Sequence, residues 1–146
     1  MAEYSANAVQ IVNPGESVIF TESPEPCNRG LVRHRDGTGN FLLAGKSKCP
    51  CQRCVNYNVA TGANISIPTG GTVEAITIAL TVDGATVPSS QMEVTPAAVE
   101  EYFNVSKVID VPIWTGCCQT VTLRNTSAQP IQIKNANIDF TRPDLR

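Results

Sequence analysis

Apolar and polar residues alternate along much of the chain, and a period of two is typical of strands with one buried face. The clearest stretch is 76–82, where apolar residues hold one parity and smaller ones the other: Ile76, Ile78, Leu80 and Val82 against Thr77, Ala79 and Thr81. Asp83-Gly84 follows, a pair that tolerates positive φ in a tight hairpin turn. We therefore predict a hairpin whose return strand starts at Ala85.

The alternation recurs in later segments and predicts which side chains point inward: Val55, Tyr57, Val59, Ile109, Val111, Ile113, Val121 and Leu123. In segment 130–140 the apolar parity shifts between Ile133 and Ala136. One extra residue near Lys134-Asn135 would restore the face, so we predict a β-bulge there.

Earlier strands are expected within 7–12, 16–21, 30–35 and 40–45, separated by turn residues. Helical spacing is almost absent. The exception is 95–103, where Thr95 could cap a short helix with Pro96 at its first position.

Eight to ten short strands, with turn signals about every ten residues, predict an all-β antiparallel sandwich or barrel. The chain has 146 residues, of which 16% are charged, with 10 glycines and 10 prolines spread along it, and this composition fits one turn-rich domain. We expect the sandwich to occupy 26–146. Residues 1–25 are either its ordinary first strand or an assembly segment, because 7–20 is more apolar than an outer strand requires.

The charge pattern disfavours several function classes. A net charge of −2 argues against nucleic-acid binding. No apolar run is long enough for a membrane span, and the N-terminus lacks the pattern of a signal peptide, so we expect synthesis in a host cytoplasm. Arg29, Arg33 and Arg35 share one side of an expected strand, as a solvated, charge-guarded strand edge or as a contact with an acidic partner.

We predict no enzymatic activity. The single histidine, His34, lies among arginines, has no nucleophile near it in sequence, and is expected to face solvent. No glycine-rich phosphate loop opens a helix.

The cysteines are the candidate site residues: Cys27, Cys49, Cys51, Cys54, Cys117 and Cys118. Cys51-x-x-Cys54 has the spacing of half a zinc site, and Cys27 with Cys117 or Cys118 could complete it. A redox pair is disfavoured because the stretch leads into a strand rather than a helix. Disulfides or free thiols are the favoured alternative to a structural zinc ion, and no other cofactor is expected. In a sandwich the three cysteine-bearing loops are expected to gather at one end.

The C-terminal two-thirds resembles the small jelly-roll heads related to tumour necrosis factor and complement globular domains, including heads of collagen-like bacterial spore-surface glycoproteins. The likeness rests on "VNYNVATGANIS", "ALTVDGATVPSS", "TVTLRNTSAQPIQI" and "ANIDFTR". It implies a TNF-like jelly-roll β-sandwich that forms a homotrimer. The chain departs from the spore-surface heads because it lacks a collagen-like stalk and carries its cysteine cluster.

Over nearly its whole length the chain also resembles short proteins of phages and prophages, through "IPTGGTV", "VTPAAVEEYFNV" and "GCC" in that order. This likeness implies a virion protein on the capsid surface, a capsid decoration or head-fibre protein. Its partners would be copies of itself and the major capsid protein or another virion protein. One alternative is a receptor- or glycan-binding head of a tail fibre or bacterial surface protein, with Trp114 as an exposed platform. Another is a small metal-stabilised β domain.

Overall fold

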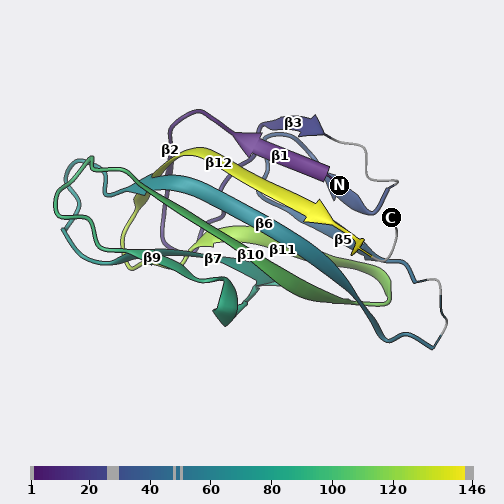
Figure 1. Ribbon diagram of the computed structural model, residues 1–146. Coiled ribbons are helices and arrows are strands. Elements are labelled where there is room, and N and C mark those ends of the chain that lie inside the picture. Colours follow the sequence, from purple (N-terminus) through teal and green to yellow (C-terminus); the bar gives the residue numbers. More distant parts are fainter. Residues whose placement is uncertain (1, 26–29, 48, 50, 144–146) are drawn as a thin grey trace.

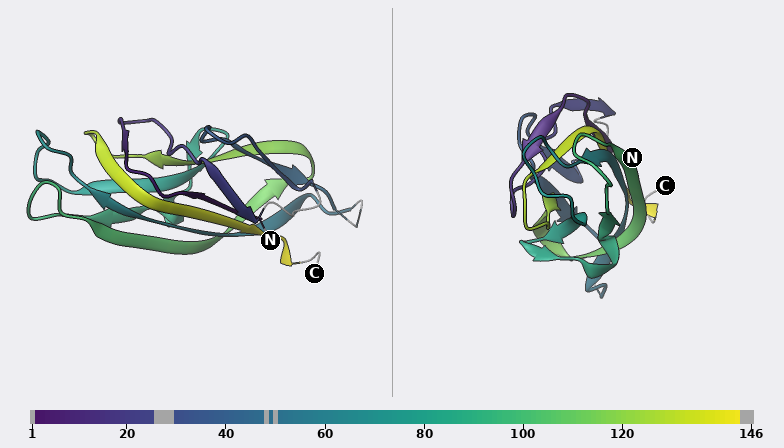
Figure 2. Two further views of the ribbon diagram at one scale, coloured as in Figure 1. Left: turned by 90° about the horizontal axis from the view of Figure 1, so that it is seen from above. Right: turned by 90° about the vertical axis from the view of Figure 1, so that its left-hand side faces the viewer.

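The computed structural model describes residues 2–25, 30–47, 49 and 51–143. Over this part the chain forms twelve β-strands and one short 3-10 turn, η1 (Pro88–Ser90). The strands build two antiparallel sheets packed face to face, so the predicted all-β antiparallel sandwich is confirmed (Figure 1). Figure 2 shows an elongated body with loops at both ends.

Sheet 1 has the order β10-β6-β12-β1-β3, and β2 also pairs with β12. Its strands are β1 (Ala2–Ala6), β2 (Gln10–Val12), β3 (Glu22–Glu25), β6 (Cys54–Ser66), β10 (Phe103–Trp114) and β12 (Ile131–Thr141). The three longest strands of the molecule therefore lie side by side in one sheet.

Sheet 2 has the order β4-β5-β11-β7-β8, and β9 also pairs with β7. Its strands are β4 (Val32–His34), β5 (Phe41–Gly45), β7 (Ile76–Val82), β8 (Ala85–Thr86), β9 (Met92–Val94) and β11 (Gly116–Asn125). The chain crosses between the sheets repeatedly, so each layer combines strands distant in sequence.

The predicted turn and bulge are confirmed. Asp83 and Gly84 have φ values of +49° and +86° in the β7–β8 turn, where a tight antiparallel hairpin requires positive φ. In β12 the register with β6 shifts between Lys134 and Asn137, and Asn135 has a φ of +52°. The bulge lets both halves of β12 send apolar side chains inward.

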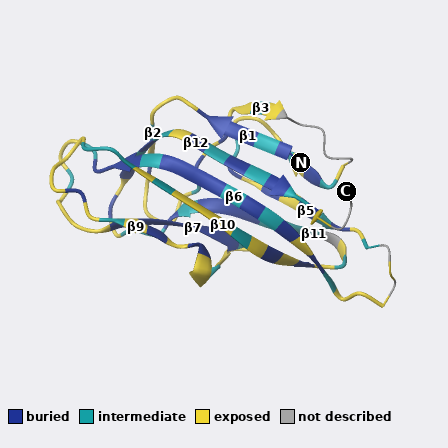
Figure 3. Ribbon diagram, in the orientation of Figure 1, coloured by how far each residue is buried: buried dark blue, intermediate teal, exposed yellow. Residues whose placement is uncertain are grey.

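The core is built from the inward parity of both sheets (Figure 3). Of the eight side chains predicted to point inward in β6, β10 and β11, seven are buried and Ile109 is partly buried. At one end an aromatic cluster surrounds Phe41, whose ring centroid lies 4.9 Å from Tyr4, 5.3 Å from Phe20 and 5.1 Å from Phe140.

Three expectations about local structure were wrong. Segment 95–102 forms bends and turns rather than a helix, because a two-turn helix is costly to nucleate and Glu100 has a φ of +60°. The Glu100 carboxylate instead accepts hydrogen bonds from the amide and hydroxyl of Thr69. Strands β1 and β3 lie outside the expected segments, and 16–21 makes only isolated bridges through Ser17 and Phe20.

The third concerns the outer parity of β7, which is buried rather than exposed: Thr77, Ala79 and Thr81. Polar partners accommodate these positions. The Thr77 and Thr126 hydroxyls hydrogen-bond at 2.7 Å, and the Thr81 hydroxyl pairs with that of Thr122. Ser90 in η1 donates to Leu80 and Val87 carbonyls, which closes the segment over this strand.

Candidate functional site

The outward surface of sheet 1, which we call the sheet 1 face, is covered mainly by short side chains. Its members alternate with the core residues of β6, β10, β12 and β1: Asn56, Asn58, Ala60, Gly62, Asn64, Ser66, Ser106, Asp110, Asn137, Asp139 and Glu3. Amide side chains bridge neighbouring strands, as Asn58 does to Asp110 at 3.1 Å and Asn104 to Asn64 at 3.1 Å. The result is a polar surface with few long side chains.

Two polar atoms on this face are buried and make no hydrogen bond within the described chain: Asp139 Oδ1 and Ser66 Oγ. Asp139 lies directly opposite Glu3 on β1 and Ala60 on β6. Desolvation first, and repulsion from Glu3 second, raise the pKa of the Asp139 carboxyl above its ordinary value. Buried polar atoms normally have partners, so these two positions are exceptions within the described chain.

Strand β10 forms one border of sheet 1, and among the described strands it pairs with β6 alone. Twelve residues long, it carries two exposed apolar side chains, Val108 at 63% and Trp114 at 65% exposure. Natural proteins usually shorten, charge or cover such edges, because an open edge pairs with other chains. The predicted exposure of Trp114 is confirmed.

The N-terminal part of the chain presents a second exposed apolar group, Val9, Ile11 and Ile19. Gln10 of β2 joins this group to segment 17–20, because its side chain donates to the Ile19 carbonyl and accepts from the Ile19 amide. Strand β1 itself lies inside sheet 1, between β12 and β3. Whether residues 1–25 act as an assembly segment stays a prediction.

His34 faces the core, so its expected exposure to solvent was wrong. Its side chain is 0% exposed and stacks on Phe41 with ring centroids 4.2 Å apart. Strand parity explains the correction, because His34 shares the inward side with Val32 while Arg33 and Arg35 point outward.

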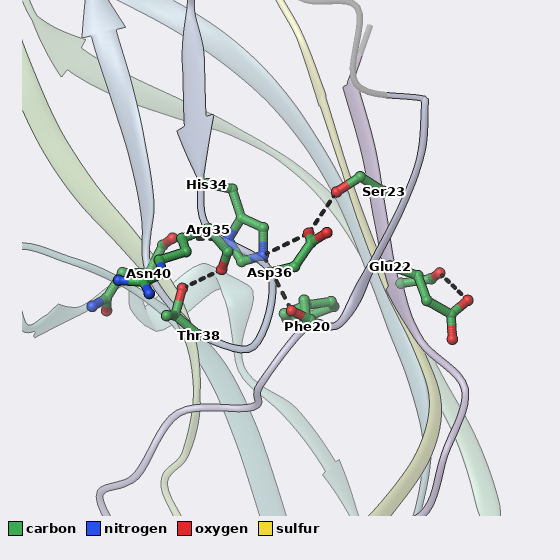
Figure 4. A network of polar contacts seen from close by, with 9 residues as sticks. Phe20, Glu22, Ser23, His34, Arg35, Asp36, Thr38 and Asn40 are labelled. Carbon is green, nitrogen blue, oxygen red and sulfur yellow. Dashed lines mark hydrogen bonds and ion pairs between the residues drawn. The ribbon is translucent and has the colours of Figure 1, made fainter.

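The His34 ring connects two loops (Figure 4). Its Nδ1 lies 3.0 Å from the Asn40 carbonyl and its Nε2 lies 3.2 Å from the Phe20 carbonyl. Asp36 Oδ1 is 4.0 Å from Nε2 and accepts a hydrogen bond from Ser23 at 2.8 Å. Both ring nitrogens thus face backbone carbonyls, and the ring fixes the turn that follows β4.

That turn is closed by Thr38, which donates to the Arg35 carbonyl through its amide and through its hydroxyl at 2.7 Å. Gly37, with a φ of +88°, supplies the positive φ that the turn requires. Gly37 donates to the Phe20 carbonyl and Phe20 to the Thr38 carbonyl, so segment 17–20 holds the turn from the side.

Two of the cysteine-bearing loops lie at the same end of the sandwich, as expected. Cys54 is opposite Trp114 in the β6–β10 register, and Thr115 donates to the Arg53 carbonyl. Cys27 and the side chain of Cys117 lie outside the described part of the chain.

Within the described part, Cys49 and Cys51 form a disulfide and Cys54 is a free thiol. Cys118 is also disulfide-bonded. Disulfide-bonded cysteines cannot serve as thiolate ligands, and the described side chains form no group of three or more metal-ligating residues. The Cys49–Cys51 bond spans a separation of only two residues, so it restricts the unfolded chain little.

The sequence pattern missed the features that distinguish the sheet 1 face. Parity alone places Asp139 outward, but its pairing with Glu3 depends on β1, which was not predicted.

Among the described residues, no helix has the length and apolarity needed to cross a membrane.

Comparison with known proteins shows the fold. No protein-family model matches the chain, and no curated protein matches it significantly. Among solved structures, the globular domain of the zebrafish complement 1qA protein is similar with a TM-score of 0.58 and 10% identity, covering 94% of both chains. The Eiger TNF of S. frugiperda is similar with a TM-score of 0.67 and 10% identity, covering 97% of this chain and 90% of that one. The sandwich is thus a jelly roll of the C1q and TNF type, as the resemblance implied.

Proposed function

We propose that this protein is a non-enzymatic structural protein that works as a homotrimer on the surface of a phage particle. The proposal of a trimer rests on the sheet 1 face and on β10, the strand at its border. Two exposed apolar side chains, Val108 and Trp114, lie on the border strand β10 beside a surface of short polar side chains. Jelly-roll domains of the C1q and TNF type form homotrimers, which supports the same assembly here.

The contact we propose places β10 of one copy against the β6–β12–β1 part of the face in the next copy. Such a head-to-tail contact uses different surfaces on the two partners, and it closes into a ring when the rotation between copies is a simple fraction of a turn. Short side chains on the face allow close approach of the neighbouring edge. Val108 would be covered by the neighbouring copy.

The N-terminal apolar group, Val9, Ile11 and Ile19, is the surface we assign to the capsid protein. It lies at the β2 end of sheet 1, past the rows in which β12 pairs with β1, and we confine the proposed trimer contact to the β1 end. A trimer would present three such groups, and the repeated contact would strengthen attachment to a symmetric lattice.

The trimer is tested by sedimentation equilibrium of the purified chain and of Val108→Glu. The chain of 15.6 kDa should sediment with three times that mass at micromolar concentration, and Val108→Glu with the single mass, because a carboxylate would be buried without a partner. Val73→Glu is the matched control, since Val73 is a 50% exposed valine outside sheet 1. A wild-type protein that stays monomeric, or a control that dissociates equally, contradicts the proposal.

The setting is tested separately, by mass spectrometry of phage particles purified from an induced culture of the source strain. We expect the chain in the particle fraction, bound to empty capsids of that phage in reconstitution. The exposed Trp114 favours one second candidate, a glycan-binding head, because indole rings stack on sugars. Binding to glycans or whole cells by the isolated trimer, lost in Trp114→Ala, together with no binding to capsids, would favour that candidate.

A further inference from the structure

A groove runs along the outward surface of β4 and β5, on the opposite layer from the sheet 1 face. It consists of two adjoining depressions of about 240 and 400 Å³ that share Arg33 and Leu42. We call it the β4–β5 groove. Lys46 and Ala44 also line the first depression, and Arg35 also lines the second.

The groove is basic and its charges are not neutralised. Arg33, Arg35 and Lys46 are exposed, and their side chains make no ion pair or hydrogen bond with any described residue. None of the described lining residues is acidic. The nearest carboxylate in sequence, Asp36, is engaged by Ser23 and lies toward the His34 ring. In a chain of net charge −2, three unpaired cations in one groove are a local reversal of sign.

The cations are spaced along the groove by strand geometry. Arg33 lies opposite Leu42 in the register of the hairpin. Arg35 is two residues beyond Arg33, about 6.6 Å along an extended strand, and Lys46 is four residues from Leu42 in the other direction, about 13 Å. A ligand lying along the groove would therefore meet positive charge at both ends and in the middle, over roughly 20 Å.

The floor between the cations is apolar. Leu42 is 40% exposed although it sits on a strand, and Ala44 continues the same parity. The arginine-bearing strand is held from beneath by the buried His34 and by the turn that Thr38 closes. Arg33 and Arg35 are thus presented on a fixed backbone, which lowers the entropy lost when they bind.

We propose that the β4–β5 groove binds an extended acidic peptide segment of a partner protein, with apolar residues between its carboxylates. Arginine pairs with carboxylates through two parallel hydrogen bonds, and side chains of one parity in an extended peptide repeat at the spacing of Arg33 and Arg35. With its side chains directed sideways, the peptide turns its carboxylates toward the arginines of β4 and its apolar side chains toward Leu42 and Ala44 on β5. A peptide is favoured over an acidic polysaccharide because the described lining includes no tyrosine, tryptophan or phenylalanine to stack on sugar rings.

The experiment measures fluorescence anisotropy of a fluorescein-labelled eight-residue peptide of alternating glutamate and leucine. We expect saturable binding that weakens with salt, and no binding of the matched glutamine–leucine peptide. Arg33→Gln should weaken binding at least about tenfold, since a charge-assisted pair is lost. Arg33→Lys should lose part of the affinity because it keeps the charge but not the paired hydrogen bonds.

Two controls separate this groove from general charge and from assembly. Lys107→Gln removes one positive charge from β10, on the other sheet, and should bind the peptide as wild type does. Val108→Glu should also bind as wild type does, so a failure of the trimer leaves this result readable. Equal binding of the glutamine peptide, no effect of Arg33→Gln, or tighter binding of a sulfated heparin oligosaccharide than of the peptide would each overturn the assignment.

Discussion

The outward surfaces of the two sheets differ in chemistry, although both inward surfaces are apolar and form one core. Sheet 1 presents short amide and hydroxyl side chains, an acidic pair at Glu3 and Asp139, and an uncovered border strand. Sheet 2 is covered over β7 and is basic and grooved along β4 and β5. The inward side chains of both sheets build the core, and the outward side chains give each sheet its own surface chemistry. We therefore assign self-association to one layer and partner binding to the other.

The largest expected effect is a loss of stability when a side chain of the core between the two sheets is truncated. Phe41→Ala should lower the free energy of unfolding by about 3–5 kcal/mol, because Phe41 is 0% exposed and contacts four aromatic rings. The neighbouring Leu42→Ala should cost only about 0.5 kcal/mol, since Leu42 points outward. Urea denaturation checks both.

Leu42→Ala should nevertheless weaken peptide binding in the groove while leaving the mass of the assembly unchanged. These two adjacent residues thus separate the effect of inward side chains on stability from the effect of outward side chains on binding. If Leu42→Ala destabilised the protein as much as Phe41→Ala, the division between inner and outer parity would be wrong at this strand.

A smaller effect is expected from the acidic pair on sheet 1. Asp139→Asn, made in the Val108→Glu background to remove assembly, should raise the free energy of unfolding at pH 7 by up to about 1 kcal/mol. The wild-type carboxylate is penalised there by desolvation and by Glu3, which raise its pKa in the folded state. As the pH falls through that raised value toward the ordinary 3.8, the wild-type side chain becomes neutral and the advantage of asparagine should vanish.

Asp110→Asn serves as the control for this measurement, because Asp110 lies on the same face but accepts a hydrogen bond from Asn58. Its replacement should give no such gain at pH 7. A stabilisation by Asp139→Asn that persisted unchanged at pH 4 would show that charge is not its cause.

Much of the fold was predictable because burial imposes periodicity. Tyr57, Val111 and Leu123 lie in strands long enough to show the alternation, and the parity shift in β12 located its bulge. Strands β1 and β3 escaped prediction because their sequences carry polar residues or proline, and pairing with neighbours stabilises them. Tertiary context overrides local preference in such short strands.

The surfaces were less predictable because exposure and charge pairing depend on strand order. The arginines of segment 30–35 were recognised as a charged strand edge or an acidic-partner contact, but Leu42 and Lys46 join them only through the β4–β5 pairing. His34 was assigned to solvent because its neighbours in sequence are charged, although its parity places it against Phe41. Asp139 lies beside the like-charged Glu3, which comes from the opposite end of the chain.

The division of labour between the two sheets is tested most directly by amide hydrogen exchange in β10 and β4, compared between concentrated and highly diluted protein. The account predicts that the outward amides of β10 exchange at least about tenfold faster on dilution, as the trimer dissociates and the edge opens. Exchange in β4 should not change. Concentration-dependent protection of β4, with β10 exchanging at one rate throughout, would contradict the assignment of self-association to sheet 1.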